Sequence, residues 1–244
     1  MSGVMLRLLL VASTAAAFVP GGRAPPAVLG GVRSAATRMQ TVDGVRVGPP
    51  PDLASLLLNN RIVYLGMPLV PAVTELAVAE LLFLNYDNAG KPIYVYINSI
   101  GTAGGMGDET DAFAITDTMD YVSPPIETIC IGTAYGTAAM LLASGAKGKR
   151  QCLPNAEVML HQPRSAVRGQ ASDIAIKAKE VLRARHDVLS IIAEKTGNSL
   201  EKVTADSART RYLTADQALE YGIIDKVLRN EEDLPSKPSF LSSL

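Results

Sequence analysis

The chain has 244 residues, 48% of them hydrophobic, and a formal net charge of −1. That length can bury one sizeable core besides a leader, and the near-zero charge gives no electrostatic basis for a nucleic-acid partner. The two histidines, His161 and His186, lack metal-ligand spacing with the cysteines, so we expect no metal site. Cys130 and Cys152 are expected to be buried thiols, with a disulfide between them left open.

Residues 1–41 are expected to be a two-part targeting leader. No acid precedes Asp43, whereas arginines do. Residues 1–17 resemble a secretory signal, and residues 18–41 are basic and rich in small side chains, like a transit peptide. This order predicts the plastid stroma of an alga with extra plastid membranes, with the mitochondrion as the alternative. The apolar run is too short for a membrane span, and we expect no membrane association.

Helical and strand patterns alternate through the rest of the chain. Apolar residues at helical spacing predict helices, and short β-branched or aromatic runs predict strands. The helices are expected at 52–58, 70–86, 112–121, 137–145, 172–197 and 213–222, and the strands at 61–65, 93–98, 126–132, 158–160 and 223–228. This alternation predicts an α/β fold with a mostly parallel sheet whose faces are covered. Residues 231–244 are polar and predict a flexible tail.

The segment Ile131–Leu142 predicts a strand, a sharp turn at Gly136 and the start of a helix. Such a turn is where a nucleophile gains exposure and where backbone amides converge on a developing oxyanion. Six further motifs follow in a fixed order, namely Tyr-Ile-Asn-Ser at 96–99, Gly-Ala-Lys-Gly-Lys-Arg at 145–150, Leu-Pro-Asn at 153–155, His-Gln-Pro at 161–163, Gly-Gln-Ala-Ser-Asp at 169–173 and Glu-Tyr-Gly-Ile-Ile-Asp at 220–225. With these motifs the chain resembles, over residues 42–230, the proteolytic subunit family of the Clp protease (ClpP).

The resemblance implies a ClpP/crotonase-like fold of repeated ββα units with a protruding strand-helix handle at about 164–198. It aligns Gly136 with the family's nucleophilic serine, His161 with its base and Thr210 with its acid. Glycine has no side chain to attack a carbonyl, and threonine carries no charge to stabilise an imidazolium. We therefore expect no intact catalytic triad, with His161 inherited from the fold rather than working as a base.

The resemblance also implies an oxyanion-hole-like set of backbone amides at Gly101, Thr102 and Thr137. The family has Pro-Gly-Gly after Asn-Ser, whereas Ile100 and Thr102 stand at the proline and the second glycine. Extra glycine-rich residues then follow within 101–110. This insertion either blocks the neighbouring cleft or is a tolerated surface loop.

Another serine could in principle replace the missing nucleophile, but none occupies the turn before the helix. A serine nucleophile needs an exposed hydroxyl with a base about 3 Å away, which makes relocation the disfavoured alternative. The serines in or near these segments are Ser99, Ser144, Ser165, Ser172 and Ser207.

Assembly surfaces are implied by the same resemblance. Gln170 and Arg209 align with contacts between two rings, and the apolar face of the handle helix would need a partner. The cleft that docks the unfoldase ATPase aligns with Tyr94, Tyr96, Tyr121, Gln151 and Leu228. Gln151 replaces an aromatic residue of that cleft and would make its wall more polar.

The combined departures resemble the R-type, non-catalytic paralogue (ClpR) of cyanobacteria and plastids. This predicts a structural subunit that joins active Clp subunits in mixed heptameric rings of a two-ring chamber. The partner AAA+ unfoldase would use ATP, and the chain itself would bind no cofactor. One alternative is an active serine endopeptidase subunit. The other is a crotonase-like acyl-CoA enzyme, for which Glu109 is the visible acid/base candidate.

Overall fold

The structure is a computed structural model that describes residues 40–42, 45–47, 52–102, 109–164 and 168–230. The expected leader lies almost wholly outside this part, as do the expected tail and the middle of the insertion, residues 103–108. The chain divides into two units, Met1–Pro50 and Pro51–Leu244. In the first unit, β1 (Gln40–Val42) and β2 (Val45–Val47) form an antiparallel pair that was not predicted.

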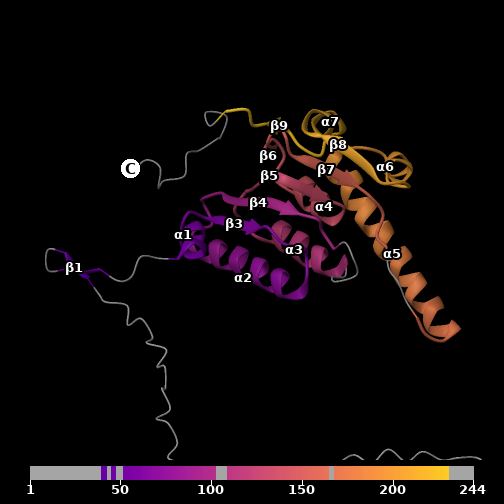
Figure 1. Cartoon of the computed structure of the whole chain (residues 1–244), viewed down its shortest axis with the longest axis horizontal. Helices are drawn as coiled ribbons and strands as arrows, with labels where there is room; N and C mark the ends of the chain where they lie inside the picture. Colours follow the sequence, from indigo (N-terminus) through magenta and orange to yellow (C-terminus); the bar gives the residue numbers. More distant parts are fainter. Residues whose placement is uncertain (1–39, 43–44, 48–51, 103–108, 165–167, 231–244) are drawn as a thin grey trace, which may run out of the picture. The chain divides into compact units, whose positions relative to one another are not determined.

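The second unit is built on one mixed sheet (Figure 1). Its parallel strands lie in the order β3 (Ile62–Leu65), β4 (Ile93–Ser99), β5 (Ile126–Tyr135), β6 (Arg150–Cys152) and β9 (Lys226–Val227). Strand β5 is longer than β6, and its C-terminal end pairs in parallel with β7 (Glu157–Leu160) instead. Strand β7 in turn pairs antiparallel with β8 (Arg211–Thr214). The predicted α/β fold with a mostly parallel sheet is confirmed.

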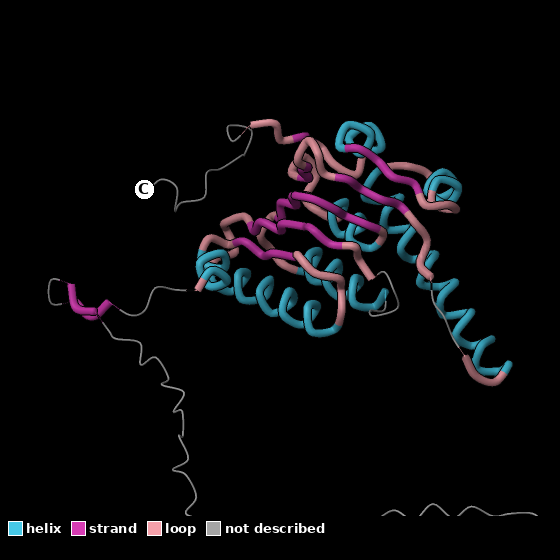
Figure 2. The backbone as a smooth tube through the Cα atoms, in the orientation of Figure 1, coloured by secondary structure: helices cyan, strands magenta, loops and turns pink. Residues whose placement is uncertain are grey.

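Seven helices connect the strands in the part of the chain that the structure describes (Figure 2). They are α1 (Leu53–Asn59), α2 (Pro71–Asp87), α3 (Glu109–Tyr121), α4 (Thr137–Ala143), α5 (Ala171–Thr196), α6 (Leu200–Asp206) and α7 (Ala215–Tyr221). Local chemistry sets their ends. Asp52 caps α1 by accepting a hydrogen bond from the amide of Ser55, and Gly197 ends α5 in the left-handed conformation that glycine adopts without a steric penalty.

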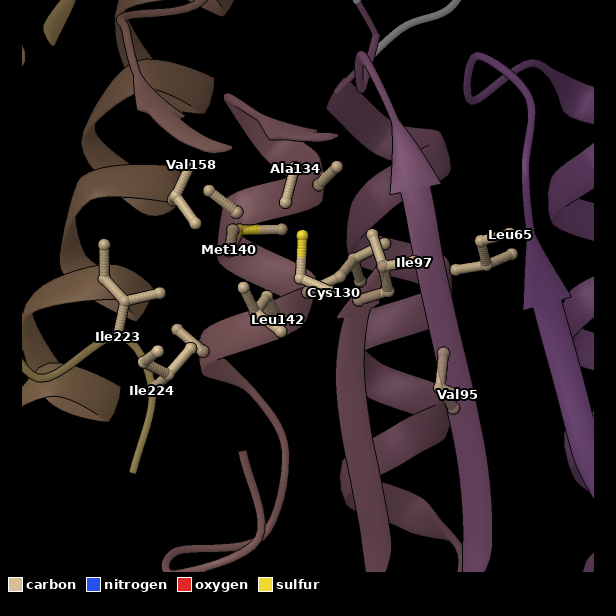
Figure 3. Packing of buried hydrophobic residues seen from close by; sticks show 14 of the residues in the cluster. Leu65, Val95, Ile97, Cys130, Ala134, Met140, Leu142, Val158, Ile223 and Ile224 are labelled. Atoms are coloured by element: carbon tan, nitrogen blue, oxygen red, sulfur yellow. The ribbon is translucent and has the colours of Figure 1, made fainter. Parts of the chain in front are cut away.

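Helix α4 lies at the centre of the core and is buried along its whole length. Figure 3 shows Met140 and Leu142 beside Cys130 of β5, with Val158 of β7 close by. Cys130 is in register with Cys152 on β6, and both are free, buried thiols, as favoured from the sequence. The turn that begins α4 is therefore held by a helix that cannot move without disturbing the core.

Several elements differ from the predicted ones. Strand β6 and helix α6 were not predicted, and α3 begins three residues before the predicted residue 112. Residues 211–214 form β8, so the helix expected to start at residue 213 starts at Ala215. The final strand is confined to Lys226–Val227, because Ile223 and Ile224 turn into the core.

The two halves of α5 differ in burial. Its C-terminal half packs on the core through Val188, Leu189 and Ile192, whereas Ile176 and Leu182 in the other half are 69% and 60% exposed. In Figure 1 the exposed half extends away from the sheet. This is the helix of the expected handle, whose neighbouring residues 165–167 are not described. Among the described helices, none is long and apolar enough to cross a membrane.

Candidate functional site

Gly136 forms a one-residue turn between β5 and α4. Its φ is 55° and its ψ is −110°, a region that residues with a side chain rarely adopt. Its amide donates to the carbonyl of Met159 at 2.8 Å, which ties the turn to β7. A Cβ built on Gly136 would lie 2.4 Å from Nε2 of His161. The imidazole therefore occupies the space in which a side chain at position 136 would begin.

His161 follows β7, which places its ring above the turn. Its Nδ1 lies 2.9 Å from the carbonyl oxygen of Gln162, and that contact requires the proton on Nδ1. Nε2 faces Gly136. A backbone dipole orients this ring, in place of the carboxylate that orients a catalytic histidine.

Thr210 lies at the same cavity as His161, just before β8. Its hydroxyl accepts a long hydrogen bond from Nη2 of Arg164 at 3.5 Å. The cavity has a volume of about 300 Å³. Its lining residues are Thr102, Glu109, Thr137, Met159, His161, Pro163, Arg164, Val188, Thr210 and Tyr212. The fold thus brings together the residues that align with the family's base, its acid and two of its oxyanion-hole positions.

Two of the three amides proposed as an oxyanion hole, those of Gly101 and Thr102, already have partners inside the chain. The amide of Gly101 donates to Oγ of Ser99 at 3.1 Å, and the amide of Thr102 donates to Oγ1 of Thr137 at 3.0 Å. Gly101 has φ 70°, and a Cβ there would lie 2.5 Å from the carbonyl oxygen of Tyr135. Glycine at 101 is what lets this turn lie close against the start of α4.

Sequence reasoning missed Arg164 and Tyr212 as lining residues, although Arg164 lies three residues after His161 and Tyr212 lies two residues after Thr210. Tyr212 packs edge-on against Tyr135, with ring centroids 6.0 Å apart. The phenol of Tyr135 donates to Oε2 of Glu157 at 2.6 Å, and this hydrogen bond, together with burial and the carboxylate charge, raises the pKa of Tyr135 to about 12. Alternation along β8 could have indicated that Tyr212 lies on the same side as Thr210, but this strand was not predicted.

The serines considered as replacement nucleophiles lie elsewhere. The hydroxyls of Ser99 and Ser144 donate to backbone carbonyls, and Ser207 is buried. Ser172 is exposed on α5, and Ser165 lies outside the described residues. None of the four described serines lines the cavity at His161. The described residues also contain no cluster of three or more histidine, cysteine or acidic side chains that could hold a metal ion.

A second, mostly apolar cavity of about 430 Å³ includes two of the residues expected at the ATPase-docking cleft, Tyr96 and Leu228. Tyr94 and Tyr121 do not line it, and Tyr121 is 75% exposed at the end of α3. Gln151 does not line it either. It is only 3% exposed, because β6 lies between β5 and β9, and its Oε1 has no hydrogen-bond partner among the described residues.

The positions expected at a contact between rings are both on the surface. Gln170 is the exposed N-cap of α5, and its side chain makes no capping hydrogen bond. Arg209 is exposed between α6 and β8. Their exposure leaves both side chains accessible to another chain.

A parallel-sheet scaffold, a strand-turn-helix at residue 136 and a histidine beside that turn are the arrangement expected of a serine-peptidase type of fold, with glycine at the position predicted for the nucleophile. The profile of the Clp protease family matches residues 50–231. The chain belongs to the Clp protease family, which confirms the resemblance drawn from its motifs.

Three relatives illustrate the similarity. The chain is 53% identical over 207 residues to an ATP-dependent Clp protease proteolytic subunit-like protein of Synechococcus elongatus, which covers 79% of this chain and 91% of the relative. It is 51% identical to the chloroplastic ATP-dependent Clp protease proteolytic subunit-related protein 4 of Arabidopsis thaliana, over 75% of this chain and 61% of the relative. It is 49% identical to the ATP-dependent Clp protease proteolytic subunit 2 of Gloeobacter violaceus, over 74% of this chain and 81% of the relative.

Proposed function

We propose that this chain is a non-catalytic structural subunit of an ATP-dependent Clp serine protease core, assembled with serine-bearing subunits in mixed heptameric rings. Gly136 carries the proposal. The turn keeps the unusual backbone geometry of a nucleophile position, with φ 55°, but glycine has no atom that can form an acyl-enzyme. The names of two similar chloroplast proteins, which call them related to proteolytic subunits, support the same interpretation.

The neighbouring groups also favour a non-catalytic role. His161 is oriented by the carbonyl of Gln162, and Thr210 accepts from Arg164, so neither of these two contacts pairs the imidazole with a carboxylate. In template serine proteases, removing triad members leaves about 10³–10⁴ of acceleration over water, far below the rate of an active subunit. An active endopeptidase subunit is the alternative that the experiment below must exclude. Membership of the Clp family gives no support to an acyl-CoA enzyme, although Glu109 does line the cavity.

Assembly would use surfaces that the described part of the chain leaves exposed. The exposed half of α5, with its apolar side chains Ile176 and Leu182, suits a contact between rings, together with Gln170 and Arg209. The apolar cavity at Tyr96 and Leu228 suits a loop of the AAA+ unfoldase, which would use ATP while this chain binds no cofactor. The chloroplastic relatives support a location in the plastid stroma, and the predicted signal and transit leader favours an alga with extra plastid membranes.

The test compares the purified chain with the same chain co-expressed with a serine-bearing Clp subunit. We expect no hydrolysis of a fluorogenic peptide by the chain alone, and we expect the two chains to co-purify in a ring. Gly136→Ser and the double variant Gly136→Ser with Thr210→Asp test whether the lost groups limit turnover. Gly148→Ser is the matched control, because Gly148 also has a positive φ, 83°, but no neighbouring atom within 4 Å of a built Cβ.

Two results would overturn the proposal. Peptide hydrolysis by the unmodified chain, abolished by a serine-directed reagent, would identify a nucleophile elsewhere in the chain. Failure to co-purify with any serine-bearing subunit, while the chain remains folded, would remove the structural role.

A further inference from the structure

The hydroxyl of Thr137 lies beside the amide of Thr102 at the edge of the cavity. It accepts the amide hydrogen of Thr102 at 3.0 Å and faces Oγ1 of Thr102 at 3.3 Å. We propose that this hydroxyl is an internal plug, which takes the acceptor position at the Thr102 amide and so closes the site independently of the missing nucleophile. The inference deepens the proposed function and rests on it.

The contact joins two segments that are far apart in sequence. Thr102 ends the turn after β4, and Thr137 is the first residue of α4. Gly101 holds the two segments together, since a Cβ on Gly101 would lie 2.6 Å from Oγ1 of Thr137. The turn is packed against the helix so closely that the two threonine side chains meet.

The burial of Thr137 makes this plug persistent. The residue is only 5% exposed, so its hydroxyl has little access to water. Oγ1 accepts one hydrogen bond and donates another to Thr102, which satisfies the group inside the protein. A ligand oxygen could use the Thr102 amide only by displacing this hydroxyl, which would then need another partner.

The consequence concerns transition-state charge. Oxyanion stabilisation requires an amide hydrogen that is aimed at the developing charge and is not committed elsewhere. The amide of Thr102 is committed to Thr137 and that of Gly101 to Ser99, so two of the three proposed oxyanion donors are already used inside the chain. Restoring a serine at 136 and an acid at 210 would therefore leave an impaired site.

The experiment uses the full chain carrying Gly136→Ser and Thr210→Asp, and measures its labelling by a fluorophosphonate probe. Thr137→Val removes the hydroxyl at nearly constant shape and keeps the backbone amide. We expect it to raise the labelling rate by about 10²-fold, the usual effect of one oxyanion donor. Thr137→Ser keeps the hydroxyl and should leave the rate unchanged. Thr133→Val is the matched control, because Thr133 lies on β5 and does not line this cavity.

Hydrogen exchange of the Thr102 amide, measured by mass spectrometry, provides an independent readout. We expect faster exchange in Thr137→Val than in the chain with Thr137, and no change in Thr137→Ser. Equal labelling of the Val and Ser variants, when labelling is detectable, overturns the plug. When no variant is labelled, exchange decides: unchanged exchange overturns the plug, and faster exchange in Thr137→Val alone supports it.

These outcomes are separate from a failure of the proposed function. Hydrolysis by the unmodified chain contradicts the non-catalytic role without any change at Thr137. Conversely, an unmodified chain that stays inactive while the Thr137 variants behave alike retains the proposed function and loses only the plug.

Discussion

The surroundings of Arg150 and of His161 contrast sharply. The guanidinium of Arg150 donates to both carboxylate oxygens of Asp225, at 2.8 and 2.6 Å, and to the carbonyl of Lys195 at 3.0 Å. The imidazole of His161 donates to the neighbouring carbonyl of Gln162. The charge of Arg150 is paired where it joins β6, α5 and the segment before β9, whereas the uncharged Thr210 stands at the position that aligns with the family's acid. This contrast fits the proposed non-catalytic role, in which the scaffold is kept and the peptidase site is not.

The pKa of Asp225 reflects this pairing. Burial acts to raise it, but the hydrogen bonds and charge of Arg150 and the amide of Gly148 outweigh burial and hold the pKa below its usual value. A lowered folded-state pKa stabilises the protein above the unfolded-state pKa, and that stability is lost as pH falls through the folded-state pKa. The ion pair should therefore contribute fully at neutral pH.

The largest expected effect comes from breaking the paired region. Asp225→Asn leaves the buried Arg150 without its anion and should lower the free energy of unfolding by roughly 3 kcal/mol at pH 7. The difference should shrink in acid, because Asp225 itself becomes protonated there. Urea denaturation at pH 7 and at about pH 3 measures both values.

Asp216→Asn is the control for this prediction. Its side chain is 72% exposed and lies 3.6 Å from the exposed Arg229, so the change should stay within about 0.5 kcal/mol. Equal losses for the two variants would show that the Arg150 network contributes no more than a surface pair.

The next effect tests the uncharged region. Gly136→Ala should lower stability by roughly 2 kcal/mol, because alanine would have to adopt φ 55° and its Cβ would overlap His161. Adding His161→Ala removes the overlap but not the backbone strain. A double-mutant cycle should then show a coupling of about 1 kcal/mol.

Gly148→Ala is the control that separates the cost of the positive φ from the cost of overlap with His161. Gly148 has φ 83° and open space around a built Cβ, so its cost should not depend on His161. Absence of coupling between Gly136→Ala and His161→Ala would mean that the imidazole does not rest over position 136.

A smaller effect of opposite sign is expected at Gln151. Its buried Oε1 has no partner among the described residues, so Gln151→Leu should stabilise the chain by about 1 kcal/mol. Thermal or urea unfolding measures the change. Gln170→Leu on the exposed N-cap of α5 is the control and should leave the stability nearly unchanged. If Gln151→Leu instead destabilises the chain, Oε1 of Gln151 forms a hydrogen bond to an internal water.

The smallest effect concerns Tyr135 beside the cavity. Glu157→Gln should lower the pKa of this phenol from about 12 towards 10, because the carboxylate that binds the phenolic proton is gone. A raised tyrosine pKa stabilises the fold below pH 10, and that stability is lost as pH rises through 12. Difference absorbance titration against Tyr135→Phe isolates this tyrosine, and an unchanged midpoint would contradict the assignment.

Short motifs were enough to predict the parallel sheet and the positions of Gly136 and His161, because those residues end or follow regular elements. They did not predict β8, a short edge strand whose Arg-Tyr-Leu-Thr sequence borders a helix pattern. The role expected for Gln151 depended on which face of an unpredicted strand it occupied. The contact of Thr102 with Thr137, and the imidazole over Gly136, depend on rotamers that no local pattern determines.

The backbone conformation of Gly136 also makes glycine and serine unequal in strain at this turn. A serine at φ 55° would hold its hydroxyl outward at a steric cost, whereas glycine adopts the same conformation almost freely. Changing glycine back to serine would restore that strain and displace the His161 ring that occupies the space. Replacing serine by glycine at this turn therefore relieves strain and the reverse change restores it, so under the proposed function the backbone itself favours the form without a nucleophile.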